Sequence, residues 1–317
     1  IIVKIEDEGG TVGIGGAAPS TYYGETIDTV EAVLPSLLQA VERIDDINNL
    51  GKIEQNLYTT VRDNPAARCA VSIACHDLVA KRLGLPLYRY WGLDPDESIH
   101  TSYTIGIDDI ETVKEKAENA ISRGHSILKV KVGTDNDEEI LQAIRDVAPN
   151  IRLRVDANEA WQPHEAVAQI NALQAYDIEF VEQPVPGDDL AGLQYVYEHS
   201  PLPIAADESC VTAQDIPKIA DRVDIANLKL MKCGGIREAF RMIHTARAHN
   251  LEVMCGCMVE SNASIAAAAH LSPLLDYADL DGSLLLEDDP YTGVPFDDGY
   301  IDLNHVDRPG TAATYNE

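Results

Sequence analysis

Eight short apolar runs alternate with helical stretches between residues 100 and 282, and this pattern constrains the fold more than any other feature. The runs are strand-like and lie at residues 100–107, 127–133, 153–158, 179–184, 203–209, 225–230, 252–257 and 277–282. The stretches between them have the periodicity of amphipathic helices, of which ETVKEKAENAISRG is a clear example. Strands that alternate with helices form parallel sheets, and eight such units are typical of a closed barrel. We therefore expect an α/β fold with a parallel barrel in this region.

The first part of the chain predicts a different arrangement, in which strands are followed by helices. IIVKIEDEGGTVGIGGAA has the pattern of a β-hairpin with its turn at Glu8-Gly9-Gly10. Helical patterns follow at residues 26–42, 45–56 and 65–83. Pro86 and the turn-rich GLDPDES end this region, so we place a domain boundary near residue 97 and the barrel at 98–285.

The formal net charge of −29 argues against nucleic acid or an anionic membrane surface as a partner. No run of about 18 apolar residues is present, so no membrane-spanning helix is expected. The acidity fits an ordinary acidic enzyme, or a halophilic protein in which carboxylates hydrate the surface and salt screens their repulsion. The low lysine content and the three Phe residues favour adaptation to high salt.

Two kinds of site are not supported by their usual motifs. The six cysteines lack CxxC spacing and supply too few ligands for zinc, so reduced thiols in a cytoplasmic protein are the expected state. Gly234-Gly235 lacks the GxGxxG frame, so no dinucleotide site is expected.

Charged side chains fall at or just before the ends of five successive runs: Lys131, Asp156, Glu182, Asp207 and Lys229. Neighbours in this series are 22 to 26 residues apart, which is one strand–helix unit each time. Because the C-terminal ends of barrel strands converge on one mouth, we expect these side chains to meet there. Three carboxylates would repel one another unless a cation neutralised them, and carboxylates with water suit Mg²⁺. The alternative is that each acid caps the helix after its strand.

Four of the ten lysines lie in two short segments, KVK and KLMK. Lys129 and Lys131 are two apart on one strand and so share a face, whereas Lys229 ends its run and Lys232 begins the following loop. A solvated edge strand would also alternate lysines, but the apolar positions between and beside the KVK lysines indicate an inner strand. Lysines beside a cation and beside each other have depressed pKa values, so one can be neutral and act as a base.

This set of side chains suits removal of a proton from a carbon next to a carboxylate. The resulting enediolate carries extra negative charge, which a metal ion on the carboxylate oxygens stabilises. Lys131 and Lys229 would lie on opposite sides of the mouth, so one removes the proton and the other returns one to the opposite face. A Schiff-base aldolase would need one lysine and no set of three acids, and a non-catalytic barrel would need neither.

The motifs KVKVG, LRVDANEAW, EFVEQPV, PIAADES, NLKLMKCGGI and CGCMVES resemble the muconate-lactonising subgroup of the enolase superfamily over nearly the whole chain. The resemblance implies a (β/α)7β barrel, a modified TIM barrel, with an α+β N-terminal capping domain. The cap would consist of residues 1–97 and the C-terminal tail 286–317. In the family, a strand and a mobile loop that selects the substrate precede the point where this chain begins. Superfamily sites use a Lys or His base with Mg²⁺.

Two features resemble the dipeptide epimerases of that subgroup, of the type that epimerises L-Ala-D/L-Glu. One is GIGGAAPS, where most relatives have Gly-Glu-Ala and this chain has Gly16. The other is Asp279-Leu280-Asp281 at the eighth strand, where two acids on one face suit a free ammonium group. The alternative is that the two acids belong to a polar barrel end and a helix cap. The competing activities are muconate cycloisomerase, o-succinylbenzoate synthase and N-acylamino acid racemase, whose substrates offer no free ammonium.

Carried over position by position, the resemblance implies a role for ten residues. Asp156, Glu182 and Asp207 would bind Mg²⁺, and Lys131 and Lys229 would be the acid/base pair. The substrate pocket would be lined by Thr104, Lys129, Cys257, Asp279 and Asp281, with Lys129 against the metal-bound carboxylate. The partner would be a small-molecule dipeptide, for which Glu is the family's default second residue. The oligomeric state, a homo-oligomer included, stays open.

Overall fold

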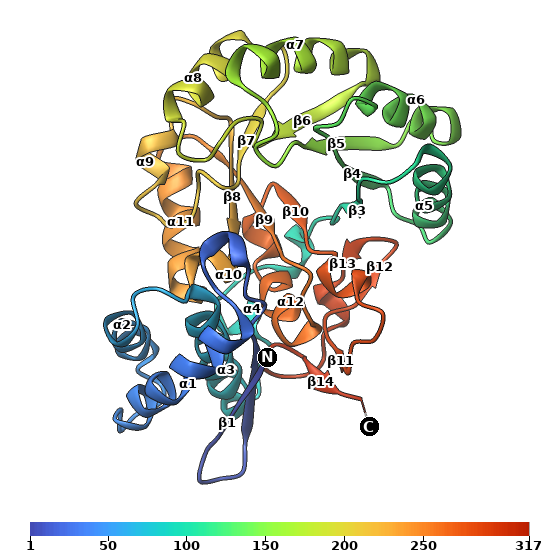
Figure 1. Cartoon of the computed structure of the whole chain (residues 1–317). Coiled ribbons are helices and arrows are strands. Elements are labelled where there is room, and N and C mark those ends of the chain that lie inside the picture. The colour runs from blue at the N-terminus through green and yellow to red at the C-terminus, as the bar shows by residue number, and fades with distance from the viewer. Residues whose placement is uncertain (317) are drawn as a thin grey trace.

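The computed structural model describes residues 1–316, and Figure 1 shows a barrel with a second, smaller part packed below it. Eight parallel strands form one sheet in the order β10-β9-β8-β7-β6-β5-β4-β3. Their bounds are β3 Tyr103–Ile105, β4 Ile127–Lys131, β5 Arg152–Asp156, β6 Ile178–Glu182, β7 Ile204–Ala206, β8 Ile225–Lys229, β9 Glu252–Gly256 and β10 Tyr277–Asp279. Each strand overlaps one of the eight apolar runs, so the expected parallel sheet is confirmed.

Hydrogen bonds between the start of β3 and the end of β10 close the sheet into a barrel. Thr101 forms a parallel bridge with Ala278, and the Ser102 amide donates to the Ala278 carbonyl oxygen at 3.0 Å. The Leu280 amide donates to the Thr101 hydroxyl oxygen at 2.7 Å. These bonds satisfy backbone groups that would otherwise lie on two exposed edges.

Helices follow the first seven barrel strands, whereas β10 leads into the 3-10 turn Gly282–Leu285. The helices are α5 Ile110–Ser122, α6 Asp137–Val147, α7 Pro163–Leu173, α8 Leu190–His199, α9 Ile216–Ile219, α10 Leu230–Cys233 with α11 Ile236–Ala248, and α12 Asn262–Ala269. Seven strands are each followed by a helix or a helix pair, and the eighth is not, so the predicted (β/α)7β barrel is confirmed.

Large side chains fill the barrel interior just below the strand ends. The apolar members of this layer form a buried cluster: Phe180, Ala205, Ile225 and Met254. Arg154, only 1 % exposed, lies over the rings of Phe180 and Tyr277 at 5.2 and 5.1 Å from their centroids. Because side chains two apart on a strand share a face, Phe180 and Arg154 lie one layer beneath Glu182 and Asp156. This layer is the floor of the barrel mouth.

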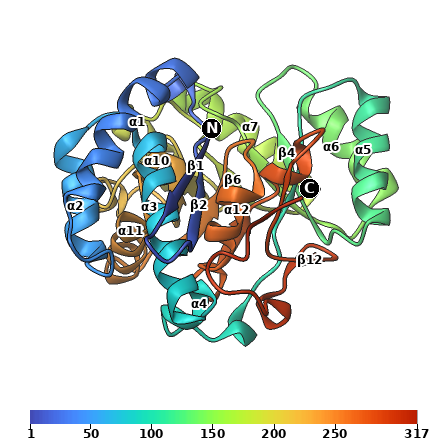
Figure 2. The same ribbon diagram turned by 90° about the horizontal axis from the view of Figure 1, so that it is seen from below.

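The smaller part begins with the hairpin β1 Ile2–Glu6 and β2 Val12–Gly16, followed by α1 Ile27–Glu42, α2 Leu50–Thr60 and α3 Pro65–Leu83. Figure 2 shows the hairpin between α3 and α12, both of which β2 contacts. A Cβ atom at Gly13 or Gly15 would lie 2.0 Å from a backbone oxygen of α3. The two glycines therefore permit an approach that no other residue would allow.

Local sequence patterns predicted most of this part correctly. The hairpin, its turn and the helices expected at 26–42 and 65–83 are confirmed. The helix expected at 45–56 instead runs over Leu50–Thr60, because Asn49 caps it by accepting from the Lys52 amide at 3.3 Å. Among the described residues, the helices are too short or too polar to cross a membrane. The domain boundary near residue 97 stays a prediction.

Asp77 of α3 ties the hairpin and the C-terminal tail to the same helix. Its carboxylate accepts from the Ile14 amide at 2.8 Å and from the Thr311 amide at 2.7 Å. It also pairs with Lys81 Nζ at 2.6 Å, although Asp77 itself is 0 % exposed. These partners replace the water that a buried carboxylate would lose on folding.

We expect Asp77→Ala to lower the free energy of unfolding by about 3 kcal/mol, because it strands two buried amides and a lysine. Glu31→Ala makes the same charge change on an exposed position of α1 and should alter stability by less than about 0.5 kcal/mol. Urea unfolding followed by circular dichroism measures both. Equal effects of the two substitutions would contradict the role of Asp77.

Candidate active site

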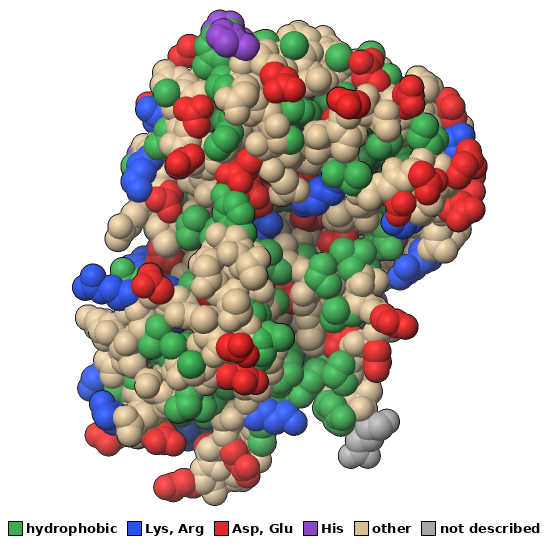
Figure 3. All heavy atoms as spheres, viewed as in Figure 1, with side chains coloured by type: hydrophobic (Ala, Val, Ile, Leu, Met, Phe, Trp, Pro, Cys, Tyr) green, Lys and Arg blue, Asp and Glu red, His purple; other side chains and the backbone are tan. Residues whose placement is uncertain are grey.

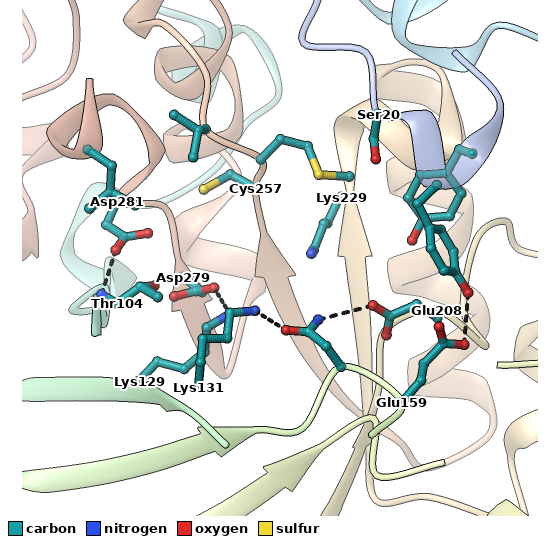
Figure 4. Close-up of a pocket in the computed structure, with 16 residues that line it drawn as sticks. Ser20, Thr104, Lys129, Lys131, Glu159, Glu208, Lys229, Cys257, Asp279 and Asp281 are labelled. Carbon is teal, nitrogen blue, oxygen red and sulfur yellow. Dashed lines mark hydrogen bonds and ion pairs between the residues drawn. The ribbon is translucent and has the colours of Figure 1, made fainter. Parts of the chain in front are cut away.

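A pocket of about 380 Å³ opens at the C-terminal ends of the barrel strands. Seven of the expected site residues line it: Thr104, Lys129, Lys131, Lys229, Cys257, Asp279 and Asp281. The smaller part of the molecule contributes Ser20, Tyr22 and Tyr23 as a further wall, and Figure 4 shows the labelled side chains around the cavity. The pocket therefore lies at the barrel mouth, where the strand-end side chains were expected to meet, and the smaller part of the molecule covers one side of it.

The three predicted metal ligands do not line this pocket themselves but lie directly behind its lysines, at the ends of adjacent strands. Asp156 and Glu182 end β5 and β6 and are direct register partners, and Asp207 follows β7 by one residue. Their exposed fractions are 0, 0 and 1 %. They do not cap the helices that follow, whose N-caps are Gln162, Asp189 and Asp215. The alternative interpretation of the acids as helix caps is therefore wrong.

Each of these carboxylates has one oxygen held by the protein framework and the other facing a pocket lysine. The framework donors are the Asn158 amide to Asp156 at 3.0 Å, Asn227 Nδ2 to Glu182 at 2.7 Å, and Lys232 Nζ to Asp207. The pocket lysines are Lys131 on Asp156 at 2.7 Å, Lys129 on Glu182 at 3.4 Å, and Lys229 on Asp207 at 2.7 Å. The framework donors thus orient the three carboxylates, and the pocket lysines neutralise their charge.

This donor set fits a hard divalent cation. Residues 1–316 contain no group of three His, Cys, Asp or Glu side chains that already converges on one point, because the acids are directed at lysines. The second oxygen of each acid meets only an ammonium group, which a divalent ion could replace. Burial and then the charge of Asp156 raise the pKa of Glu182 to about 7, so its ionised form is disfavoured and a cation beside it would stabilise that form.

Lys131 and Lys229 end β4 and β8, which are four strands apart in the eight-stranded barrel and so lie on opposite walls. Both side chains reach the pocket in Figure 4. Burial lowers the pKa of Lys229, but the charges of Asp207 and Glu182 outweigh it and hold that pKa well above its usual value. Two carboxylates therefore favour the ammonium form of Lys229 among the protein's own charges, and the depressed pKa expected beside a cation stays a prediction.

Lys129 is more deeply placed than the resemblance implies. It is 3 % exposed and forms three ion pairs, one with Asp279 and the others with Asp156 and Glu182 at 3.4 Å each. Burial lowers its pKa, but these three charges raise it well above the usual value. Lys129 therefore joins the acids of β5, β6 and β10 across the mouth, in addition to lining the pocket.

Asp279 and Asp281 both line the pocket but are not equivalent. Asp279 ends β10, pairs with Lys129 and accepts from Ser102 Oγ at 2.6 Å. Asp281 follows the strand, so the two acids do not share one strand face as expected. It accepts from the Thr104 amide at 2.6 Å, and within residues 1–316 it pairs with no Lys or Arg. Burial, followed by the charge of Asp279, raises the pKa of Asp281 to about 6.

Several contributors to the site were missed or misplaced by sequence reasoning. Asn158 lies two residues after Asp156, and Asn227 lies two residues before Lys229. Because residues two apart on a strand share a face, this spacing could have predicted both asparagines at the site. Lys232 was expected in a loop, but it lies in the one-turn helix α10. The Tyr22 hydroxyl donates to Glu159 Oε1 at 2.8 Å across the two parts of the molecule, a contact that no sequence spacing predicts.

Comparison with known families accounts for almost the whole chain. Residues 112–317 match the family described as Enolase C-terminal domain-like, and residues 1–92 match Mandelate racemase / muconate lactonizing enzyme, N-terminal domain. The chain belongs to the enolase superfamily. The resemblance drawn from the strand-end motifs is thereby confirmed.

Within the enolase superfamily, the chain is similar to proteins named as epimerases of dipeptides. It is 40 % identical to the L-Ala-D/L-Glu epimerase of Bacteroides thetaiotaomicron, over 97 % of this chain and 79 % of that one. It is 41 % identical to the hydrophobic dipeptide epimerase of Enterococcus faecalis, over 92 % of this chain and 85 % of that one. A crystal structure of the Enterococcus faecalis dipeptide epimerase, with Mg and L-Leu-L-Tyr, superposes with a TM-score of 0.93 at 38 % identity, covering 99 % and 91 % of the two chains.

Proposed function

We propose that this protein is a Mg²⁺-dependent isomerase that epimerises a dipeptide by 1,1-proton transfer at the carbon next to the carboxylate. The placement of Lys131 and Lys229 on opposite walls of a pocket that also contains Asp281 carries the proposal. The relatives support it, since the matched enzymes are named dipeptide epimerases and one structure contains Mg and a dipeptide.

Asp156, Glu182 and Asp207 would hold the Mg²⁺ ion through the oxygens that now face lysines. When bound, the ion would supply positive charge next to the substrate carboxylate, which stabilises an enediolate. The framework donors behind the three acids fix the orientation of their carboxylates. The buried floor layer of the barrel keeps water from entering the site from below.

The two lysines would act on opposite faces of the α-carbon. Lys131 Nζ is held by Asp156 Oδ2 at 2.7 Å and Asn158 Oδ1 at 2.5 Å, and Lys229 Nζ by Asp207 Oδ2 at 2.7 Å. A neutral lysine takes the α-proton, the electron pair of the C–H bond passes into the enediolate, and the opposite ammonium group returns a proton. The carbon is inverted. By analogy, Lys131 is assigned to the R epimer and Lys229 to the S epimer.

Asp281 would bind the free ammonium group of the substrate. Asp279 is already neutralised by Lys129, whereas Asp281 is buried without a cationic partner in the described part of the chain. An extended dipeptide spans about 7 Å, which suits the distance scale of a barrel mouth. Muconate, o-succinylbenzoate precursors and N-acylamino acids would leave this buried charge unpaired, which disfavours those reactions.

The second side chain of the substrate would meet Glu159 and Glu208 at the other end of the pocket shown in Figure 4. Glu159 accepts from the Tyr22 hydroxyl and from the Gly187 amide at 2.5 Å, and Glu208 accepts from Asn158 Nδ2 at 3.2 Å. No Lys or Arg within residues 1–316 pairs with either acid. We therefore propose a neutral or basic second side chain rather than Glu, the family default.

A dipeptide library incubated with enzyme and Mg²⁺ in deuterated water tests the assignment, because each turnover exchanges the α-proton for deuterium. We expect incorporation and epimerisation for free dipeptides, and a higher kcat/KM for L-Ala-L-Gln than for the isosteric L-Ala-L-Glu. Mass spectrometry and chiral chromatography give the two readouts. Preference for muconate or an N-acylamino acid would defeat the dipeptide assignment, and preference for L-Ala-L-Glu would defeat only the assignment of the second side chain.

We expect Lys131→Ala and Lys229→Ala each to abolish epimerisation, because each removes the proton donor or acceptor on one face. Each variant should still exchange the α-proton of the one epimer that its remaining lysine can reach. Lys218→Ala, at a lysine whose side chain is 57 % exposed, is the control and should keep wild-type activity. A two-base mechanism is excluded if either pocket variant epimerises at the wild-type rate.

We expect Asp281→Asn to raise KM about tenfold or more, because a charge-assisted hydrogen bond is worth about 1.5–3 kcal/mol and 1.4 kcal/mol is tenfold. N-acetylation of the dipeptide should do the same to the wild-type enzyme. Since only the ionised carboxylate attracts an ammonium, KM should also rise as the pH falls through about 6, the pKa of Asp281. Asp288→Asn, at an exposed position, is the control. Equal turnover of free and acetylated dipeptides would refute this role.

We also propose a cytoplasmic setting of high salt. The net charge is −29, and acidic side chains outnumber basic ones on the face seen in Figure 3. Screening of this self-repulsion by KCl should raise the melting temperature. A melting temperature that falls or stays constant up to molar KCl would contradict the high-salt setting.

A further inference from the structure

Lys232 is a buried cation that does not line the pocket. Its side chain is 0 % exposed, and Nζ donates to the Asp207 carbonyl oxygen at 2.6 Å and the Asn227 carbonyl oxygen at 3.0 Å. The third contact of Nζ is with Asp207 Oδ1. An ammonium group has three donors, so all are used within the protein.

The local backbone explains how Lys232 reaches this position. β8 ends at Lys229, which has extended backbone angles, and the single turn of α10 then brings Lys232 back under the strand ends. Gly234, with a φ of 83°, ends this turn in the left-handed conformation that glycine adopts without strain. Lys232 therefore contacts the end of β7 through Asp207 and the interior of β8 through Asn227.

The two oxygens of Asp207 consequently have different cationic partners. Lys232 holds Oδ1 from the buried side, whereas Lys229 approaches Oδ2 from the pocket side at 2.7 Å. Lys229 can leave Oδ2 when it reaches toward a substrate, but Lys232 is enclosed and has no other partner to move to. The orientation of the Asp207 carboxylate therefore depends on Lys232 alone whenever Lys229 is engaged elsewhere.

We propose that Lys232 is a positioning residue for the cation site, which keeps Oδ2 of Asp207 turned toward the pocket. This inference rests on the proposed role of Asp207 as a Mg²⁺ ligand. Removal of Lys232 frees the carboxylate to rotate toward Lys229 and takes one donor from each of two backbone carbonyl oxygens, although the Asp207 oxygen still accepts from the Cys210 amide at 3.0 Å. Partners behind metal ligands typically affect metal affinity by about 10- to 100-fold.

A purely charge-balancing role for Lys232 leads to the opposite result. Loss of a positive charge next to a carboxylate strengthens the attraction of that carboxylate for a divalent cation. The charge-balancing role therefore predicts equal or tighter Mg²⁺ binding, whereas the positioning role predicts weaker binding. The sign of the change in affinity separates the two roles without any measurement of catalysis.

Isothermal titration of Mg²⁺ into the protein, without substrate, provides the test. We expect Lys232→Met, which keeps the length of the side chain, to weaken Mg²⁺ binding at least tenfold while the far-UV circular dichroism spectrum is retained. Lys218→Met makes the same charge change on the surface and should leave the affinity unchanged. Lys232→Gln, whose amide can donate to Asp207, should restore part of the affinity and serves as the readout if Lys232→Met does not fold.

Wild-type or tighter Mg²⁺ binding by folded Lys232→Met overturns the positioning role, and if that variant does not fold, binding by Lys232→Gln that is tighter than wild type overturns it. This outcome leaves the proposed function intact, because the wild-type protein still binds Mg²⁺. Absence of Mg²⁺ binding by the wild-type protein would instead overturn the proposed cofactor, and the positioning role with it. At saturating Mg²⁺ the variants should recover a larger part of kcat than at limiting Mg²⁺, which a general loss of structure would not produce.

Discussion

The site is built on a buried network in which four carboxylates face four lysines. Asp156, Glu182, Asp207 and Asp279 are each at most 2 % exposed, and each contacts at least one of Lys129, Lys131, Lys229 and Lys232. Burial of so many charges costs more desolvation energy than apolar packing would, so the network adds little stability for its size. Its value is chemical, because it holds opposite charges close together where burial of the carboxylates weakens screening by water.

The network depends on the strand register and the closure of the barrel. Asp156 and Glu182 are direct partners in the register of β5 and β6, and a shift of one residue would turn either side chain out of the interior. Phe180 and Arg154 fill the layer beneath them, so the two carboxylates have no room to move deeper into the barrel. The parallel bridge between Thr101 and Ala278 closes the sheet and brings Asp279 of β10 next to Lys129 of β4.

The distribution of partners makes the network asymmetric. The buried side holds its acids through fixed donors such as Asn227 and Lys232, while the pocket side holds them through lysines that can exchange partners. Protein carboxylates alone keep Lys229 in its ammonium form, so proton removal by this lysine depends on a further positive charge near Asp207 and Glu182. The same argument separates Asp279, which is neutralised by Lys129, from Asp281, which is not.

The sequence by itself determined the barrel and most of the site, because both follow from local periodicity. Strand ends recur with each strand–helix unit, and Lys131, Asp156, Glu182, Asp207 and Lys229 mark those ends whatever the loops between them do. Helix positions were predictable where caps agreed with periodicity and failed at residues 45–49, where Asn49 delays the start of α2. The motifs also identified the superfamily correctly.

Only the tertiary structure decided which charges neutralise one another. Strand spacing places Lys129 and Asp279 at the mouth, but barrel closure makes them partners and thereby leaves Asp281 without a cation. Lys232 was expected in a loop, and the turn of α10 places it behind Asp207 instead. The contact of Tyr22 with Glu159 joins residues that are 137 positions apart. Such pairings depend on how distant segments close on one another, and local propensity and periodicity carry no information about that.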